Sequence, residues 1–108
     1  MAENKNISVQ QLKIKIDNGD NFILLDVREK FELDIACLPD ALHIPMREIP
    51  DHLDELNKNH EIIVFCKSGI RSMNVCNFMY NNGFKRVFNL AGGINRWSEE
   101  IDKSIPIY

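Results

Sequence analysis

Short apolar runs bounded by polar residues recur along the chain. The run at residues 21–27 is almost continuously apolar, and so is the β-branched run at 62–65. A continuous apolar run of this length is typical of a strand that is buried on both faces of a sheet. Shorter runs at 41–44 and 86–90 predict two further strands.

Between these runs, apolar side chains recur at helical spacing. Ser8 followed three residues later by Gln11 has the pattern of a capping box and predicts a helix start, with Gly19 as the helix end. The side chains predicted to face inward from this helix are Val9, Leu12 and Ile16. The other helical patterns lie at 50–57, at 72–80 with a stop at 81–83, and after Gly92 and Gly93 around Ile94 and Trp97.

Strands that alternate with helices indicate an α/β fold with a parallel sheet covered on both faces. In such folds the ligand binds at the carboxyl ends of the strands. The clearest candidate for chemistry at such an end follows the run at 62–65.

Composition limits the chain to one ordinary domain. It has 108 residues, of which 44% are hydrophobic and 27% charged, and its net charge is -3. An acidic balance argues against a nucleic-acid partner, and no apolar segment approaches the length needed to span a membrane. The polar residues 1–6 do not have the pattern of a signal peptide, so we expect a cytoplasmic protein.

Cysteine usage favours thiol chemistry over a structural role. Cys37, Cys66 and Cys76 are an odd number and form no C-x-x-C pair, so neither a disulfide framework nor a zinc ribbon is indicated. The three histidines show no metal-ligand spacing with the cysteines, and we predict no metal site. Cys76 lies among apolar helical positions and is interpreted as core packing.

The segment 66–72 joins a predicted strand to a predicted helix and begins with Cys66. A loop that wraps from a strand end into a helix N-terminus directs successive backbone N–H groups inward, where no helical carbonyl accepts them. These N–H groups and the Arg71 guanidinium favour the thiolate of Cys66 over the thiol. The pattern therefore predicts a cysteine nucleophile in an anion cradle.

This loop, C-x-x-G-x-R-S, resembles the active-site loop of rhodanese domains, which carry sulfur as a cysteine persulfide. Residues 26–29 resemble the family's D-x-R-E segment, and 38–45 resemble its G-H-I-P-G-A-x-N-I-P stretch. Residues 83–97 resemble its G-F-x-x-V-x-x-L-x-G-G-x-x-x-W ending. The resemblance implies a rhodanese-like α/β domain with a mostly parallel five-stranded sheet and helices on both faces. We expect one domain over 1–108, with its core at about 7–98 and a loosely held tail at 99–108.

The length of the loop separates the activities found in this family. Four residues lie between Cys66 and Arg71, whereas rhodanese-like phosphatases resemble C-x-x-x-x-x-R, with one residue more. A smaller cradle suits a persulfide sulfur, and a tetrahedral phosphoryl group needs a wider one. Sulfur transfer is favoured, and the alternatives are a rhodanese-like phosphatase or arsenate reductase and a noncatalytic binding module.

The resemblance implies a cycle without metal or organic cofactor. Cys66 takes sulfur from a small donor such as thiosulfate, or from a protein persulfide, and passes it to a thiol or sulfur-carrier acceptor. The predicted persulfide cradle consists of Lys67, Ser68, Gly69, Ile70, Arg71 and Ser72, with Gly69 at positive φ and Ser72 as a helix cap. Lys67 is expected to be either a contact for the substrate anion or a solvent-exposed side chain without a role. The fork of Arg71 is expected to bind loop carbonyls or a carboxylate.

Asp26 and Arg28 follow the first apolar strand and are expected near the same crevice. The resemblance implies that Asp26 supports the loop and that Arg28 helps to hold the substrate or a neighbouring segment. The alternative is a structural ion pair at the strand end. One small acidic domain gives no reason to require more than a monomer.

Two departures from the family pattern leave further hypotheses open. Ala36 and Cys37 stand where the family commonly has Gly-His, so Cys37 adds a thiol that in principle accepts sulfur from Cys66 and forms a disulfide. The alternative for Cys37 is a small buried hydrophobe. The tail resembles the end of rhodanese domains fused to adenylating enzymes that activate ubiquitin-like sulfur carriers.

Overall fold

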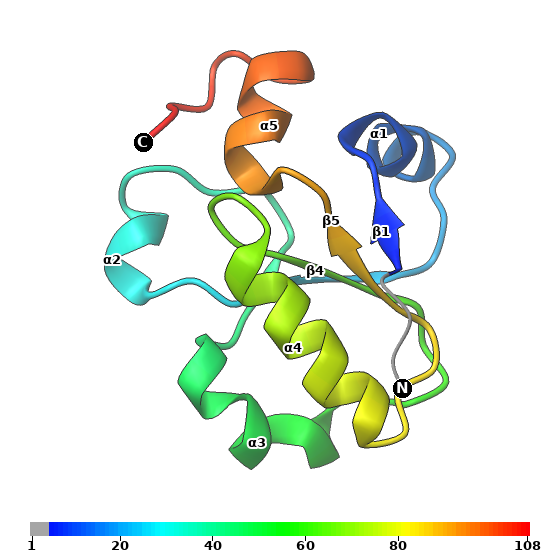
Figure 1. The fold of residues 1–108 in the computed structure, drawn as a ribbon. Helices are drawn as coiled ribbons and strands as arrows, with labels where there is room; N and C mark the ends of the chain where they lie inside the picture. The colour runs from blue at the N-terminus through cyan, green and yellow to red at the C-terminus, as the bar shows by residue number, and fades with distance from the viewer. Residues whose placement is uncertain (1–4) are drawn as a thin grey trace.

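The computed structural model describes residues 5–108 as an α/β fold built on one five-stranded sheet (Figure 1). The strands lie in the order β1-β5-β4-β2-β3, and all pairs are parallel, so the predicted fold class is confirmed. The strands are β1 Asn6–Ile7, β2 Ile23–Asp26, β3 Leu42–His43, β4 Ile62–Phe65 and β5 Val87–Leu90. The α-helices are α1 Val9–Asp17, α2 Lys30–Leu33, α3 Ile49–His52, α4 Ile70–Asn81 and α5 Gly93–Glu100, and 3-10 turns flank α3 at Met46–Glu48 and Leu53–Glu55.

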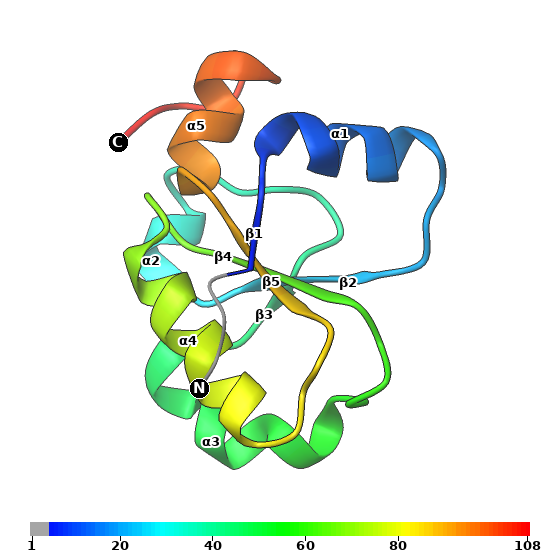
Figure 2. The ribbon, with the colours of Figure 1, turned by 45° about the vertical axis from the view of Figure 1, so that its right-hand side comes forward.

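Two hydrophobic layers cover the sheet. Helices α1 and α5 lie on one face, and α3 and α4 lie on the other (Figures 1 and 2). Successive side chains of β4 alternate between the layers: Ile62 and Val64 pack into the α3 and α4 layer, and Ile63 and Phe65 pack into the other. This alternation explains why the strand is apolar at every position.

The predicted capping box at the start of α1 is confirmed, but one of the three side chains predicted to face inward is exposed. Ser8 is the N-cap, and its hydroxyl accepts the N–H of Gln11 at 3.0 Å while the Gln11 side chain accepts the N–H of Ser8 at 2.8 Å. Val9 and Leu12 are buried as predicted, but Ile16 is 45% exposed. The two-residue strand β1 escaped prediction because it is too short to show a pattern.

The tail after Trp97 is held more firmly than its sequence predicts. The N–H groups of Ile101 and Asp102 donate to the carbonyl of Trp97, at 2.8 and 3.0 Å. At the end of the tail, the Asn95 side chain donates to the carbonyl of Tyr108 at 2.9 Å and accepts the N–H of Tyr108 at 3.3 Å. The expectation of a loose tail is therefore wrong.

The parallel register brings two predicted site segments together. Asp26 at the end of β2 pairs with Phe65 at the end of β4, and the N–H of Val27 donates to the carbonyl of Phe65 at 3.2 Å. Cys66 and Arg28 therefore follow neighbouring strands at the same edge of the sheet. Within residues 5–108, no helix is long and apolar enough to cross a membrane.

Candidate active site

Cys66 lies at the floor of a loop whose polar groups converge on its sulfur. The backbone N–H of Gly69 lies 3.1 Å from Sγ, and the N–H of Ser72 lies 3.4 Å from it. The Ser72 hydroxyl oxygen lies 3.3 Å from the same atom. The residue is only 1% exposed, so these contacts surround a sulfur that is largely withdrawn from solvent.

The loop adopts this shape because its carbonyls are bound on the other side. The N–H groups at the start of α5 meet them: Ile94 donates to the carbonyl of Cys66 at 2.9 Å, and Asn95 donates to the carbonyl of Lys67 at 3.2 Å. Gly93 makes this approach possible, since a Cβ there would lie 2.5 Å from the Cys66 carbonyl oxygen. With the carbonyls held by α5, the loop N–H groups are free to face the sulfur.

The loop also sets the start of α4. Gly69 is the N-cap of this helix and has φ +106°, a conformation that L side chains rarely adopt. The predicted positive φ is confirmed, but the prediction that Ser72 caps the helix is wrong. Ser72 lies inside the first turn and is fully buried, and its hydroxyl oxygen lies 3.3 Å from Cys66 Sγ.

These contacts shift the pKa of Cys66 below its ordinary value. Burial by itself raises the pKa, because it disfavours the charged thiolate. The Ser72 hydroxyl, when it donates to the thiolate, and the N–H groups of Ser72, Gly69 and Ser68 act in the opposite direction and outweigh burial. By contrast, burial raises the pKa of Cys76 to about 12, with the nearby Cys66 as a smaller cause. Cys76 is a core residue, as predicted.

Arg71 forms a bidentate ion pair with Glu32 of α2. Its two terminal nitrogens donate to the two carboxylate oxygens at 2.8 and 2.9 Å. The hydrogen bond from Arg71 is the main reason why the pKa of Glu32 falls to about 2. Glu32 raises the pKa of Arg71 in turn, and the Cys66 charge adds to that rise. Of the two predicted kinds of partner for Arg71, loop carbonyls or a carboxylate, the structure shows a carboxylate.

Sequence reasoning did not find Glu32, although a signal was present. Glu32 stands three residues after Glu29, and its carboxylate accepts the Glu29 N–H at 2.8 Å, as in a capping box. That pattern indicates only a short helix. The helix places the carboxylate against Arg71 because α2 lies beside the loop, which is a matter of tertiary packing (Figure 1).

Asp26 and Arg28 form a buried ion pair below the loop. Arg28 donates to the two oxygens of Asp26 from Nε at 3.0 Å and from Nη2 at 2.8 Å. Its Nη1 donates to the Tyr108 hydroxyl at 2.9 Å, and that hydroxyl donates to Glu32 at 2.8 Å. Two roles were expected for Arg28: holding the substrate or holding a neighbouring segment. Because Arg28 is 0% exposed, it offers no surface to a substrate, and it holds the neighbouring segment.

The remaining loop side chains lie at the rim. Ser68 is exposed, and Ile70 is 73% exposed. The Lys67 ammonium lies 5.0 Å from the centroid of the Tyr108 ring, within range of a cation–π interaction. The tail thus contacts the loop through Tyr108, which no sequence pattern indicated.

Two other features stand apart from the loop. Cys37 is exposed, so the interpretation of Cys37 as a small buried hydrophobe is wrong.

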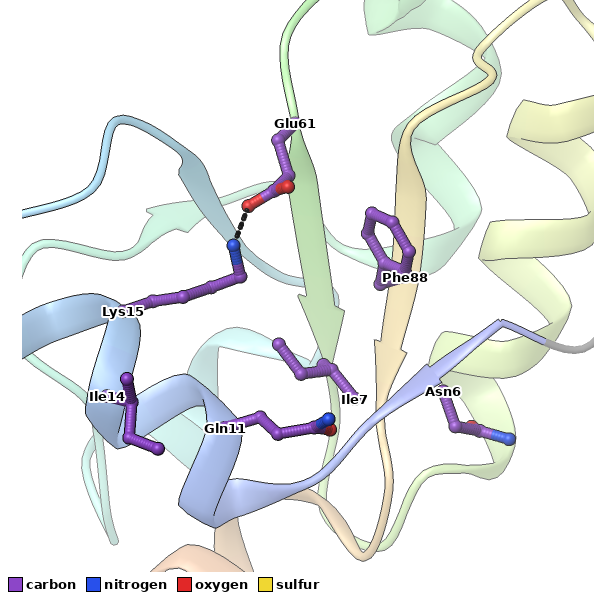
Figure 3. Close-up of a pocket in the computed structure, with 7 residues that line it drawn as sticks. All are labelled: Asn6, Ile7, Gln11, Ile14, Lys15, Glu61 and Phe88. Carbon is purple, nitrogen blue, oxygen red and sulfur yellow. Dashed lines mark ion pairs between the residues drawn. The ribbon is translucent and has the colours of Figure 1, made fainter.

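A pocket between α1 and the strands is lined by Ile14, Lys15, Glu61 and Phe88 among others (Figure 3). Glu61 precedes β4 whereas Cys66 follows it, so the Glu61 side of this pocket lies at the end of the strand away from the loop. No group of three metal-ligating side chains is found in residues 5–108.

The sequence matches a protein-family model and several known relatives. The model of the rhodanese-like domain matches residues 8–100, so the chain belongs to the rhodanese-like family. YtwF of Bacillus subtilis is 43% identical over 98 residues, which cover 91% of this chain and 94% of that protein. A protein of Allochromatium vinosum named "Sulfurtransferase" is 34% identical over 85% of this chain and 86% of its own length.

A longer relative and a solved structure extend the comparison. The "Adenylyltransferase and sulfurtransferase UBA4" of Debaryomyces hansenii is 37% identical over all of this chain, which spans only 27% of that protein. The crystal structure of a rhodanese-like domain protein from Staphylococcus aureus superposes with a TM-score of 0.83 at 33% identity and covers 96% of this chain and 98% of its own. The relatives' names support a rhodanese-like sulfur transfer function.

Proposed function

We propose that this protein is a sulfurtransferase that carries sulfane sulfur as a persulfide on Cys66. The observation that carries the proposal is the convergence of the Gly69 and Ser72 N–H groups on one sulfur atom. Such donors stabilise a sulfur anion without reorganising during the reaction. Arg71 adds positive charge, and Glu32 holds its guanidinium in place.

The proposed cycle has two displacements. In the first, the Cys66 thiolate attacks the outer sulfur of thiosulfate or of a protein persulfide. An S–S bond forms to Cys66, the donor's S–S bond breaks, and sulfite or the donor thiolate leaves with the electron pair. In the second, an acceptor thiolate or cyanide attacks the outer sulfur, and Cys66 leaves as the thiolate that the loop stabilises.

The size of the cradle favours sulfur over a phosphoryl group. Two loop N–H groups already lie within 3.4 Å of Sγ. A persulfide extends the residue by one S–S bond of about 2 Å. A phosphoryl group would need space for three oxygens around the phosphorus, and this short loop closes on the sulfur itself.

The rim supports proposals for the donor and the acceptor. Lys67 is the proposed contact for a small anionic donor, because its ammonium lies beside the loop and its ring partner, Tyr108, holds it there. The name of the UBA4 relative combines adenylyl and sulfur transfer in one chain. We accordingly propose a thiol or a sulfur-carrier protein as the acceptor, in the reducing cytoplasm, with the protein acting as a monomer.

Direct detection of the persulfide tests the proposal. The purified protein is incubated with thiosulfate, excess reagent is removed, and peptide masses are recorded with and without cyanide. We expect one added sulfur on the Cys66 peptide, lost on treatment with cyanide and absent from Cys66→Ser. The exposed Cys37→Ser variant is the matched control and should still gain the sulfur.

The contrary result is equally specific. If neither thiosulfate nor a persulfidated cysteine desulfurase adds sulfur to Cys66, the sulfurtransferase proposal fails. Turnover of a phosphate ester or of arsenate that depends on Cys66 would then assign the loop to the other chemistry. Full function of Cys66→Ser in the cell would assign a binding role.

A further inference from the structure

A buried amide lies behind Ser72 and completes a polar chain that starts at Cys66. The Ser72 oxygen, 3.3 Å from Cys66 Sγ, also lies 2.5 Å from Oδ1 of Asn89 on β5. Asn89 is 3% exposed, so water does not compete for these contacts. On its other side, Asn89 meets Asn6 of β1, the strand that pairs with β5.

The orientation of the Asn89 amide follows from its partners. Its Nδ2 donates to the carbonyl of Gly69 at 3.3 Å and to Oδ1 of Asn6 at 3.1 Å. A backbone carbonyl only accepts hydrogen bonds, so the nitrogen of Asn89, and not its oxygen, must face Gly69. The oxygen then faces Ser72, and the hydroxyl of Ser72 must be the donor.

A serine hydroxyl has one hydrogen to donate. While Ser72 donates it to Asn89, the hydroxyl presents a lone pair to Cys66, which suits a thiol that donates its own hydrogen. A thiolate needs a donor instead, and Ser72 becomes one only by leaving Asn89. We propose that Asn89 is a positioning residue for Cys66: it holds the Ser72 hydrogen away from the sulfur.

Other groups act on Cys66 independently of this competition. They are the N–H groups of Gly69 and Ser72, the Arg71 cation, the adjacent Lys67 in the loop and the buried Cys76 thiol on α4. The N–H groups favour formation of the thiolate, while Asn89 limits how far the thiolate is stabilised. In the proposed sulfur transfer, on which this role rests, a less stabilised thiolate is the stronger nucleophile, because nucleophilicity rises with thiol pKa.

The test is the pH profile of Cys66 alkylation by iodoacetamide, measured on the Cys66 peptide in a Cys37→Ser background. Ser72→Ala should raise the midpoint, since the thiolate loses a donor. Asn89→Ala should lower it by about one pH unit, because a hydrogen bond to a charged group changes an equilibrium by roughly tenfold. Asn89→Leu, which fills more of the buried space, should shift the midpoint in the same direction.

Two controls separate positioning from loss of structure. Asn6→Ala removes a partner of Asn89 and leaves the contact with Gly69, so it should not move the midpoint. In Ser72→Ala/Asn89→Ala, the Asn89 substitution should have no further effect, because no hydroxyl remains to be turned. Circular dichroism and thermal melting check that each variant is folded.

The proposal is overturned if Asn89→Ala and Asn89→Leu raise the midpoint as Ser72→Ala does, or if the Asn89 effect persists without Ser72. Either result would mean that Asn89 only supports the loop. The alkylation profile does not depend on sulfur transfer. A wild-type protein that takes up no sulfur would therefore refute the proposed function and leave the role of Asn89 to be decided by this profile.

Discussion

Neutralising Glu32 should remove a pH-dependent part of the protein's stability. Glu32 is 4% exposed, its carboxylate is bound by both terminal nitrogens of Arg71, and its pKa falls from 4.5 to about 2. A folded-state pKa below the unfolded one contributes stability that is complete above the unfolded value and is lost as the pH falls toward the folded value. At 1.36 kcal/mol per pH unit, the shift corresponds to about 3 kcal/mol at pH 7, of which about 2 kcal/mol is lost by pH 3.

This magnitude is an upper value, because the Arg71 side chain is 31% exposed and solvent screens its charge. The measurement is urea unfolding of wild type and Glu32→Gln at several pH values between 7 and 3. The free energy of unfolding of the wild type should exceed that of the variant most at pH 7, and the gap should narrow below pH 4.5. Glu99→Gln, at an exposed site, is the matched control and should leave the pH dependence as in the wild type. Parallel losses in wild type and Glu32→Gln over this range would refute the reasoning.

Three further outcomes follow from the same region. Gly93→Ala places a Cβ 2.5 Å from the Cys66 carbonyl oxygen and should lower the free energy of unfolding by roughly 2–4 kcal/mol. Gly19→Ala is the control, because Gly19 also has positive φ but open space around it, and should cost about 1–2 kcal/mol. Equal losses in the two variants would contradict the close approach of Gly93 to the loop. Tyr108→Phe removes the hydroxyl between Arg28 and Glu32 and should cost about 1–2 kcal/mol in the same urea assay; no loss would show that the hydroxyl is dispensable. Lys67→Gln should raise KM for thiosulfate several-fold and change kcat little, as measured by steady-state kinetics at low ionic strength; an unchanged KM would exclude Lys67 as the anion contact.

Much of the fold was predictable because its signals are local. The apolar run of β4 needs no partner to be recognised, and the capping box at Ser8 involves neighbouring residues. Ile16 shows where this reasoning ends. It fits the helical spacing of α1, yet its side chain is 45% exposed, because it lines a surface pocket with Leu24 and Pro39.

The candidate site divides in the same way. Three features follow from the order of residues in one short loop: the position of Cys66 after a strand, the positive φ of Gly69, and an Arg71 fork that binds loop carbonyls or a carboxylate. The identity of that carboxylate does not, because Glu32 is far away along the chain and the short helix α2 brings it to Arg71. A single sequence contains no signal for such a pair.

By itself, the sequence determined the order of the longer strands and helices, the place of the proposed nucleophile and the length of the loop around it, since each depends on residues close together in the chain. Only the tertiary structure decided what surrounds the cradle. The start of α5 binds the loop carbonyls, Tyr108 joins the tail to Arg28 and Glu32, and Asn89 reaches Ser72 from the neighbouring strand. These contacts join segments distant in sequence, and hydrogen-bond partners of that kind are selected by packing and register, which local patterns do not encode.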